Sequence, residues 1–278
     1  MSKTIVVTGA TRGLGRGIAR GFAKAGVTVA VTGRDSAALA EVASEITAKG
    51  GEAMTLQCDH RDDSQVERAF AQIAEKTDGR IDLLVNNAAA VYGQDLVAPG
   101  PFWEKPLKLV DMIDVGLRSS YVASYYAAPL MVKAGKGLIA NISFYGARSY
   151  FHGPAYGAAK AGTDKMTSDM AIDFQDSGVS VVSFWPGFIL TDAVRALPPE
   201  MIPDDLKQMM PLWETPEFSA AVLGALLDDP DVATYSGKAV IGAELAERYG
   251  IKDSDGKQPI SYRSSMGDPL EFRGHPQV

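Results

Sequence analysis

The sequence contains little of several features that mark special classes of protein. It has one cysteine among 278 residues, Cys58, so no disulfide bond can form within the chain, which is typical of a reducing compartment. No run approaches the roughly 20 apolar residues that a helix needs to cross a bilayer. No basic leader with an apolar core precedes the first β-branched residues, so we expect no signal peptide and a cytoplasmic location.

Positive charge is also scarce. The chain has 27 lysines and arginines against 34 aspartates and glutamates, a net charge of −7, and no cluster of basic residues. Nucleic acid is excluded as a partner, because binding to phosphate backbones requires a basic face. The three histidines, His60, His152 and His275, show no metal-ligand spacing, so we expect no metal site.

What the sequence does have is a regular alternation of short β-branched runs and longer segments of helical spacing. Strands are predicted at residues 4–8, 27–32, 52–58, 81–87, 137–143, 179–185 and 237–242, with helices between them, such as 36–50 and 64–77. Strands that are apolar throughout and alternate with helices are typical of a parallel sheet covered on both faces. Right-handed crossovers then give a doubly wound, Rossmann-like α/β sheet of about seven strands in a single domain.

Two segments interrupt this alternation. Residues 90–106 are rich in glycine and proline, and residues 193–216 contain five prolines. Long loops in a compact domain are usually functional. We therefore predict a dinucleotide-binding and catalytic domain over residues 1–245, with a substrate loop at about 187–216. Residues 246–278 form a polar C-terminal extension. One interpretation is that this extension becomes ordered only where it contacts a partner subunit.

A glycine-rich turn follows the first predicted strand. Gly9, Gly13 and Gly15 have the spacing TGxxxGxG and precede a predicted helix. Glycine lets the chain approach a pyrophosphate closely, and the helix N-terminus directs its N–H groups at the anion. The spacing differs from GxGxxG, and an ordinary strand–helix turn is the alternative. We predict a cofactor cradle that also includes Thr11, Arg12 and Leu14.

The end of the second strand bears on the choice of cofactor. An acidic residue there binds the ribose 2′-hydroxyl of NAD, whereas arginine suits the 2′-phosphate of NADP. Asp35 lies 20 residues after Gly15, which favours NAD(H), but it falls beyond the strand and precedes Ser36 as a helix-entry residue. Arg34 and Arg12 can form a cationic pocket. The sequence therefore favours NADP(H), with NAD(H) as the alternative. The simpler explanation of Arg34 is that it is an ordinary solvated surface charge.

One tyrosine of ten, Tyr156, has a lysine four residues later, in YGAAK. In a helix these positions share a face. A free phenol has a pKa of about 10, and an ammonium about 5 Å away would lower that pKa by about two units. Tyr156 could then act as general acid in reduction and general base in oxidation. Ser143 ends a predicted strand 13 residues earlier, and its hydroxyl could stabilise a carbonyl oxygen or simply cap the strand.

The candidate residues share one place in the predicted fold. The glycine turn, Asn86–Asn87, Ser143 and Pro186–Gly187 all follow predicted strands. Open α/β sheets bind their ligands at the carboxyl ends of strands, so we expect these residues to meet in one site.

Together the motifs resemble the short-chain dehydrogenase/reductase (SDR) family. TGATRGLG (8–15), NNAA (86–89), Ser143, YGAAK (156–160) and PGFILT (186–191) stand in the family's order and approximate spacing. The resemblance covers residues 3–192 well and extends loosely to 245. The segments VGLRSSY and SFWPG are similar to the dehydrogenase/reductase member-1-like branch.

This resemblance implies an oxidoreductase that moves hydride between NAD(P) and a small-molecule ketone, aldehyde or alcohol, built as a homodimer or homotetramer. It implies that Tyr156 donates and accepts the proton, that Ser143 orients the substrate, and that Lys160 binds the nicotinamide ribose and lowers the Tyr156 pKa. The remaining implied contacts are Asp59 with adenine, Asn87, Ala88 and Ala89 with the adenosine ribose, and Ile189 and Thr191 with the carboxamide after Pro186 and Gly187.

The sequence departs from the family pattern at two positions. Ala89 replaces the glycine of NNAG, which strains the backbone only if φ is positive there. Gly116 stands where the family has a catalytic asparagine on the helix before the fifth strand, and no asparagine occurs from Pro106 to Lys136. We expect a weakened proton relay. A cofactor-binding regulator or scaffold with little catalysis is the alternative that Gly116 supports.

Aromatic residues are frequent around the expected site. An apolar pocket for a bulky substrate and ordinary core or interface packing both explain them. The residues are Tyr92, Trp103, Phe144, Tyr145, Tyr150, Phe151, Phe188 and Trp213.

Overall fold

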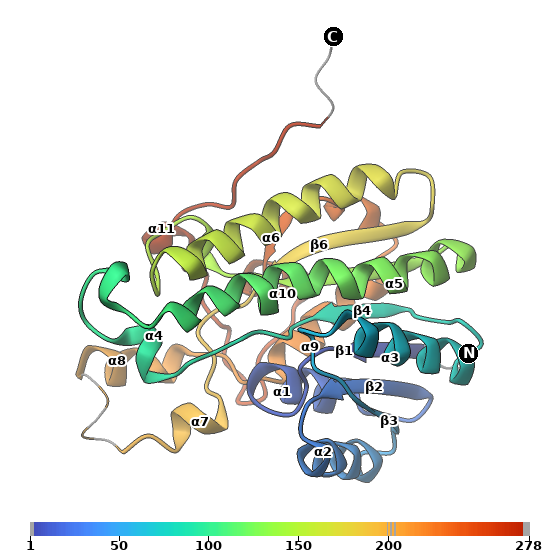
Figure 1. Ribbon diagram of the computed structural model, residues 1–278, viewed down its shortest axis with the longest axis horizontal. Helices are drawn as coiled ribbons and strands as arrows, with labels where there is room; N and C mark the ends of the chain where they lie inside the picture. The colour runs from blue at the N-terminus through green and yellow to red at the C-terminus, as the bar shows by residue number, and fades with distance from the viewer. Residues whose placement is uncertain (1–2, 199, 201, 203, 275–278) are drawn as a thin grey trace.

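The computed structural model describes residues 3–274 except 199, 201 and 203, and it contains a seven-stranded parallel sheet with helices on both faces (Figure 1). The strand order is β3-β2-β1-β4-β5-β6-β7, and every neighbouring pair is parallel. The predicted doubly wound fold is therefore confirmed. The direction in which the chain adds strands to the sheet reverses between β1 and β4. Folds of this type bind their ligands at this point.

The strands lie where the sequence predicts them, with ends that differ by at most two residues. They are β1 (Lys3–Val7), β2 (Val27–Gly33), β3 (Glu52–Gln57), β4 (Leu83–Asn86), β5 (Gly137–Ile142), β6 (Val179–Trp185) and β7 (Ala239–Ile241). The helices are α1 (Gly13–Phe22), α2 (Ser36–Ala48), α3 (Asp63–Lys76), α4 (Gln94–Val97), α5 (Ser119–Ala134), α6 (Pro154–Asp173), α7 (Asp192–Arg195), α8 (Asp204–Met209), α9 (Phe218–Asp228), α10 (Gly242–Tyr249) and α11 (Arg263–Met266).

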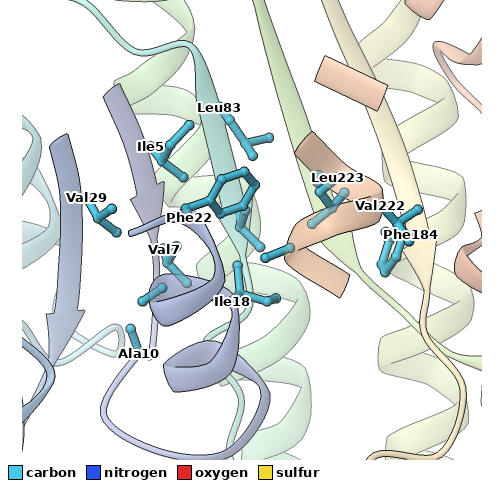
Figure 2. Close-up of a cluster of buried hydrophobic side chains, with 14 of the residues drawn as sticks. Ile5, Val7, Ala10, Ile18, Phe22, Val29, Leu83, Phe184, Val222 and Leu223 are labelled. Atoms are coloured by element: carbon cyan, nitrogen blue, oxygen red, sulfur yellow. The ribbon is translucent and has the colours of Figure 1, made fainter. Parts of the chain in front are cut away.

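Two apolar clusters hold the helices to the sheet. On one face Ile5 and Val7 of β1 pack with Phe22 of α1 and with α2 and α9 (Figure 2). On the other face Val6 packs with α3, α5 and the end of α6, for example with Phe70. Because successive side chains of a strand point to opposite faces, a strand covered on both sides must be apolar throughout.

Helix α2 begins at an acidic cap. Asp35 accepts hydrogen bonds at Oδ1 from the backbone N–H groups of Ala37 (2.9 Å) and Ala38 (3.1 Å). These bonds satisfy two of the N–H groups that have no partner within the helix. Asp35 is thus a helix-entry residue, as its position beyond the strand predicted.

The helix expected around Gly116 is broken at that residue. Val115 (φ −111°, ψ 91°) and Gly116 (φ 153°, ψ −64°) leave the helical conformation within the segment Ile113–Arg118, and α5 begins after it. The positive φ explains the glycine, because a Cβ is strained in this region. The expectation that Gly116 lies inside a helix is wrong for this reason.

The C-terminal extension packs against its own chain over much of its length. Helix α10 crosses the predicted boundary at 245. Beyond it, Asp253 accepts hydrogen bonds from Thr215, and the N–H of the buried Tyr262 donates to the hydroxyl of Tyr145 (2.9 Å). These contacts are made within one chain. After α11 the chain runs away from the body (Figure 1), and residues 275–278 lie outside the described part.

Candidate active site

A cleft of about 710 Å³ opens at the carboxyl ends of the parallel strands. Most of the predicted cofactor-binding residues line it. These are Gly9, Thr11, Arg12, Gly13, Leu14, Gly15, Arg34, Asp59, Asn87, Ala88, Ala89, Lys160 and Thr191. Sequence-distant segments thus meet at one edge of the sheet, as the shared position after the strands predicted.

The glycine turn packs tightly against the segment after β4. Gly9 has a φ of +64°, and a Cβ built there would lie 2.7 Å from Cα of Ala88. At Gly15 a Cβ would meet the side chain of Asn87, whose Nδ2 donates to the carbonyl oxygens of Thr8 (2.9 Å) and Gly9 (3.0 Å). Any larger residue would displace this turn, so the N-terminus of α1 remains open for a close anion.

Two arginines reach the part of the cleft beyond β2. Arg12 and Arg34 line it, and neither forms a salt bridge with another described residue. Arg16, by contrast, is paired with Glu45 (2.7 Å). The carboxylate of Asp35 is engaged at the start of α2. The charge available here is therefore positive, which fits a phosphate.

The segment after β3 contributes residues that sequence analysis did not assign to the site. His60 is 5% exposed, lines the cleft, and its Nε2 lies 2.7 Å from Oγ1 of Thr32, which also accepts from the N–H of Gly9 (3.2 Å). Burial lowers the pKa of His60 to about 4, so the imidazole is neutral. The sequence signal for His60 is its place shortly after the end of β3.

Arg61 bridges two loops at the rim of the cleft. Its Nη2 donates to the hydroxyl of Tyr92 (2.9 Å) and to Asp111 (2.5 Å), and Tyr92 also donates to Asp111. The loop after β3 is thereby tied to the loop at 90–111. These partners are far apart in sequence, and no spacing pattern connects them.

Tyr156 and Lys160 lie on one face of α6. The Nζ of Lys160 is 5.6 Å from the centre of the Tyr156 ring and donates to the carbonyl oxygen of Ile142 (3.0 Å). Both residues line a small cavity of about 40 Å³, and Lys160 also lines the cleft. The structure thus brings the predicted pair together at this cavity, which shares Ala89, Val115 and Lys160 with the cleft, although Tyr156 is not among the residues that line the cleft itself.

Burial controls the ionisation of this pair. It raises the pKa of Tyr156 and lowers the pKa of Lys160 to about 8. The net lowering of the Tyr156 pKa expected beside Lys160 is therefore not found, because desolvation of the phenolate outweighs the neighbouring charge. Both groups consequently carry their protons at neutral pH, although Lys160 is close to its midpoint.

Ser143 lies behind this pair and is only 1% exposed. Its hydroxyl donates to the carbonyl oxygen of Lys160 (3.2 Å). Nearby, the buried carboxylate of Asp164 accepts from Ser183 (2.5 Å) and from the indole of Trp185 (3.1 Å), so it joins α6 to β6. Asp164 follows Tyr156 and Lys160 at four-residue steps, a signal of a shared helix face that was not used.

Of the predicted residues in the turn after β6, Thr191 lines the cleft, whereas Pro186, Gly187 and Ile189 do not. Gly187 donates its N–H to the buried side chain of Glu214 (2.9 Å), and Ile189 pairs with the backbone of Glu214. Thr191 caps α7 by accepting from the N–H of Val194 (3.3 Å). Glu214 thus supports the turn at Gly187 and Ile189, and its role was not predicted from sequence.

The described residues contain no group of three or more histidine, cysteine, aspartate or glutamate side chains placed to hold a metal ion, and His275 lies outside them. Within the same range no helix has the length and apolar character needed to cross a membrane.

Residues 3–201 match the family model of the short chain dehydrogenases. The chain is 42% identical over 273 residues to mouse dehydrogenase/reductase SDR family member 1. The aligned region covers 95% of this chain and 87% of the relative. The chain belongs to the short-chain dehydrogenase/reductase family. It falls in the branch of that relative and is an oxidoreductase that acts with NAD(P), as the resemblance predicted.

Solved structures of SDR enzymes are similar in fold. A variant of actinorhodin polyketide ketoreductase with NADPH is 26% identical, covers 86% of this SDR and 95% of its own chain, and gives a TM-score of 0.75. A 7α-hydroxysteroid dehydrogenase complexed with NADH and 7-oxo glycochenodeoxycholic acid is 27% identical, covers 93% and 96%, and gives a TM-score of 0.72. The two neighbours carry different cofactors, so the fold alone does not set the preference.

The two departures of this SDR from the family pattern have different structural consequences. Among the described residues the non-glycine positions with positive φ are Asp78, His152 and Asp176, so Ala89 is not strained. The backbone of Gly116 is engaged within its own segment: its N–H donates to Oγ of Ser119 (3.0 Å), and its carbonyl accepts from Ser120 (2.5 Å). Its absent side chain leaves open space within 4 Å.

The aromatic residues of this SDR divide between core and site. Tyr145 is fully buried and packs on Trp185, whereas Trp103 (72% exposed) and Tyr150 (82% exposed) face solvent. Phe151 lies 5.9 Å from the Tyr156 ring. Phe151 also packs against Phe144 and Phe188, and Phe188 stacks on Trp213, so these four aromatic side chains form one connected cluster. Core packing therefore explains Tyr145, and the Phe144–Phe188 cluster provides an apolar wall beside Tyr156.

Proposed function

We propose that this SDR uses NADP(H) to interconvert a carbonyl and an alcohol on a small-molecule ketone, aldehyde or alcohol, with Tyr156 as the proton donor and acceptor. The observation that carries the proposal is the Tyr156–Lys160 pair on one face of α6, at a small cavity that shares Lys160 with a cleft of about 710 Å³. A cleft of this size suits a dinucleotide-sized ligand.

The residues that line the cleft fit a dinucleotide. Gly9 and Gly15 let the turn pack directly against Ala88 and Asn87, which holds the N-terminus of α1 at the cleft, where a pyrophosphate would meet its N–H groups. Asp59 would bind adenine, Asn87, Ala88 and Ala89 the adenosine ribose, and Lys160 the nicotinamide ribose. The carboxamide would meet Ile189 and Thr191. When bound, the nicotinamide ring supplies or accepts the hydride.

The preference for NADP(H) is supported by the charges beyond β2. Arg12 and Arg34 line the cleft, and the carboxylate of Asp35 already caps α2. A ribose 2′-phosphate would complement the two guanidinium groups, whereas NAD(H) would leave them without an anionic partner.

The proposed chemistry of the chain centres on one proton. In reduction, the protonated Tyr156 gives its hydroxyl proton to the oxygen of the substrate carbonyl as that oxygen gains charge. The ammonium of Lys160 then stabilises the phenolate. The Ser143 hydroxyl, which donates to the Lys160 carbonyl, would turn toward the substrate oxygen and stabilise its charge. In oxidation the phenolate of Tyr156 removes the proton of the alcohol.

The proposal extends to the surroundings of the site. We assign residues 1–245 to the dinucleotide-binding and catalytic unit and about 187–216 to substrate closure, which is supported by Asp192 and Ala193 at the cleft. We also propose that the protein is a homodimer or homotetramer and is located in the cytoplasm. The exposed Tyr121 and Tyr125 on α5 offer an apolar surface for such contacts, and light scattering would measure the oligomer.

The decisive experiment measures oxidation of NADPH by a panel of ketones and aldehydes. The Tyr156→Phe variant is expected to keep its dissociation constant for NADPH and to lose turnover by at least about a hundredfold, because the proton donor is gone. Full turnover by this variant on every active substrate would contradict the mechanism. Tight binding of NADPH by the native protein with no turnover on any substrate would favour a regulator or scaffold instead.

A further inference from the structure

A buried glutamate outside the predicted site clamps the turn after β6. Glu214 is 2% exposed, and its Oε1 accepts the N–H of Gly187 (2.9 Å). Its backbone N–H donates to the carbonyl of Phe188 (2.8 Å), and its carbonyl accepts from the N–H of Leu190 (2.8 Å). One residue thus fixes three positions of the turn 186–191, which ends at Thr191, a residue that lines the cleft.

The turn is shaped to admit this carboxyl group. A Cβ built on Gly187 would lie 2.6 Å from Oε1 of Glu214 and 3.2 Å from the ring edge of Tyr262. A larger residue at this position would therefore push the carboxyl group away. The glycine that the sequence pattern assigns to a cofactor turn serves here as the docking point of Glu214.

The second oxygen of the same carboxyl group is buried and has no hydrogen-bond partner among the described residues. Oε2 of Glu214 and the hydroxyl of Tyr262 have no hydrogen-bond partner among the described residues, and both are buried. Buried polar groups are normally hydrogen-bonded, and a carboxylate can only accept, whereas a carboxylic acid also donates. A carboxylate charge on Oε2 would therefore lie buried with no donor to stabilise it, whereas the neutral acid carries no charge.

The charges around Glu214 favour the same state. The titratable groups that face it are Asp253, Tyr145 and Tyr262, none of which is a cation. Burial, reinforced by the charge of Asp253, raises the pKa of Glu214 to about 8 although the N–H of Gly187 acts to lower it. At neutral pH the group is therefore mostly the neutral acid.

We propose that Glu214, as a neutral carboxylic acid, is a positioning residue that holds the turn 186–191 in the conformation that receives the nicotinamide end of the cofactor. The inference rests on the proposed cofactor site. Ionisation places an unpaired charge in a buried position, so the side chain leaves and the turn loosens. Cofactor affinity then falls as pH rises through the ionisation of Glu214.

The test compares three variants with the native protein. Glu214→Gln keeps the acceptor for Gly187 and cannot ionise, and Glu214→Leu removes the acceptor. Glu217→Gln is the matched control, because this partly exposed glutamate of the same segment pairs with Arg20 (3.3 Å) and contacts no part of the turn 186–191 among the interactions found. For each protein, NADPH fluorescence gives the dissociation constant from about pH 6.5 to about pH 9.5.

The native protein and Glu217→Gln are expected to lose affinity by about tenfold across this range. Glu214→Gln is expected to lose clearly less, and Glu214→Leu to bind about tenfold more weakly at every pH. Lys160 also titrates near pH 8, but it is common to all four proteins. The difference between the native and Glu214→Gln curves therefore isolates Glu214.

A second readout uses the protein without added cofactor. Hydrogen exchange of a peptide that covers residues 186–191, corrected for intrinsic rate, is expected to quicken above about pH 8 in the native protein and not in Glu214→Gln. Superimposable native and glutamine profiles in both measurements would overturn the inference. Absence of NADPH and NADH binding by the native protein, with the exchange difference intact, would overturn the proposed function and leave the clamp in place.

Discussion

The side-chain amide of Asn87 occupies the space into which a Cβ on Gly15 would project. The same amide donates to the carbonyl oxygens of Thr8 and Gly9, so it fixes the turn that leads from β1 into α1. The glycine requirement in this turn is therefore imposed by a residue more than 70 positions away. Two strand ends, and not the turn alone, define the pyrophosphate site that we propose.

This packing predicts the effect of Gly15→Ala. The added methyl group would also lie 2.5 Å from the carbonyl oxygen of Gly9, so Asn87 or the turn must move. Overpacking of this kind costs about 1–3 kcal/mol, and we expect NADPH to bind at least about tenfold more weakly. Fluorescence titration measures the constant. Gly224→Ala on α9, where a Cβ would make ordinary contact at 3.4 Å, should bind NADPH like the native protein; equal losses in both variants would contradict the prediction.

Arg34 is expected to discriminate between the two cofactors. Removal of a charged hydrogen-bonding partner of the 2′-phosphate costs about 1.5–3 kcal/mol, so Arg34→Ala should weaken NADPH binding by about 10- to 100-fold. NADH binding should change by less than about twofold, because NADH has no phosphate there. The exposed Arg68 on α3, which donates to Ser64, provides the control Arg68→Ala. Similar weakening of both cofactors by Arg34→Ala would remove the argument for NADP(H).

The pH dependence of turnover is expected to report Lys160. Burial lowers its pKa to about 8 and raises that of Tyr156, so as pH rises the lysine loses its charge while the phenol stays protonated. The kcat for carbonyl reduction at saturating NADPH should therefore fall above about pH 8. Lys160→Met should be slower by at least about tenfold and show no such limb. Glu214→Gln should retain the limb, because saturation removes effects on cofactor affinity; its disappearance there would assign the limb to Glu214.

Stability should depend on pH through Glu214. Its pKa is raised by burial from 4.5 to about 8, so the folded state binds the proton more tightly than the unfolded state. The native protein therefore loses free energy of unfolding relative to Glu214→Gln as pH rises from about 4.5 to about 8, by at most about 1.4 kcal/mol per pH unit, and the difference levels off above that range. Urea unfolding measures it. A difference that stays constant with pH would show that Glu214 does not titrate in this way.

Much of the fold followed from the sequence because its signals are local. The apolar runs at 27–32 and 179–185 and the glycine turn at 9–15 are readable from neighbouring residues, and each lies where it was expected. The four-residue spacing of Tyr156 and Lys160 likewise sufficed to place them on one face of α6. Strand ends were also enough to bring most predicted cofactor residues to one cleft.

The sequence by itself determined the parallel sheet, the glycine turn and the pairing of tyrosine with lysine, because periodicity and steric demands act over a few residues. Only the tertiary structure decided that Arg61 would meet Asp111, that Glu214 would clamp Gly187, and that the chain after α10 would fold back on its own domain. It also decided that the pKa of Tyr156 lies above the ordinary value of a phenol, whereas the sequence predicted a lower one. Those outcomes depend on which distant segments exclude water from a group, and desolvation is a property of the packed molecule that no spacing along the chain encodes.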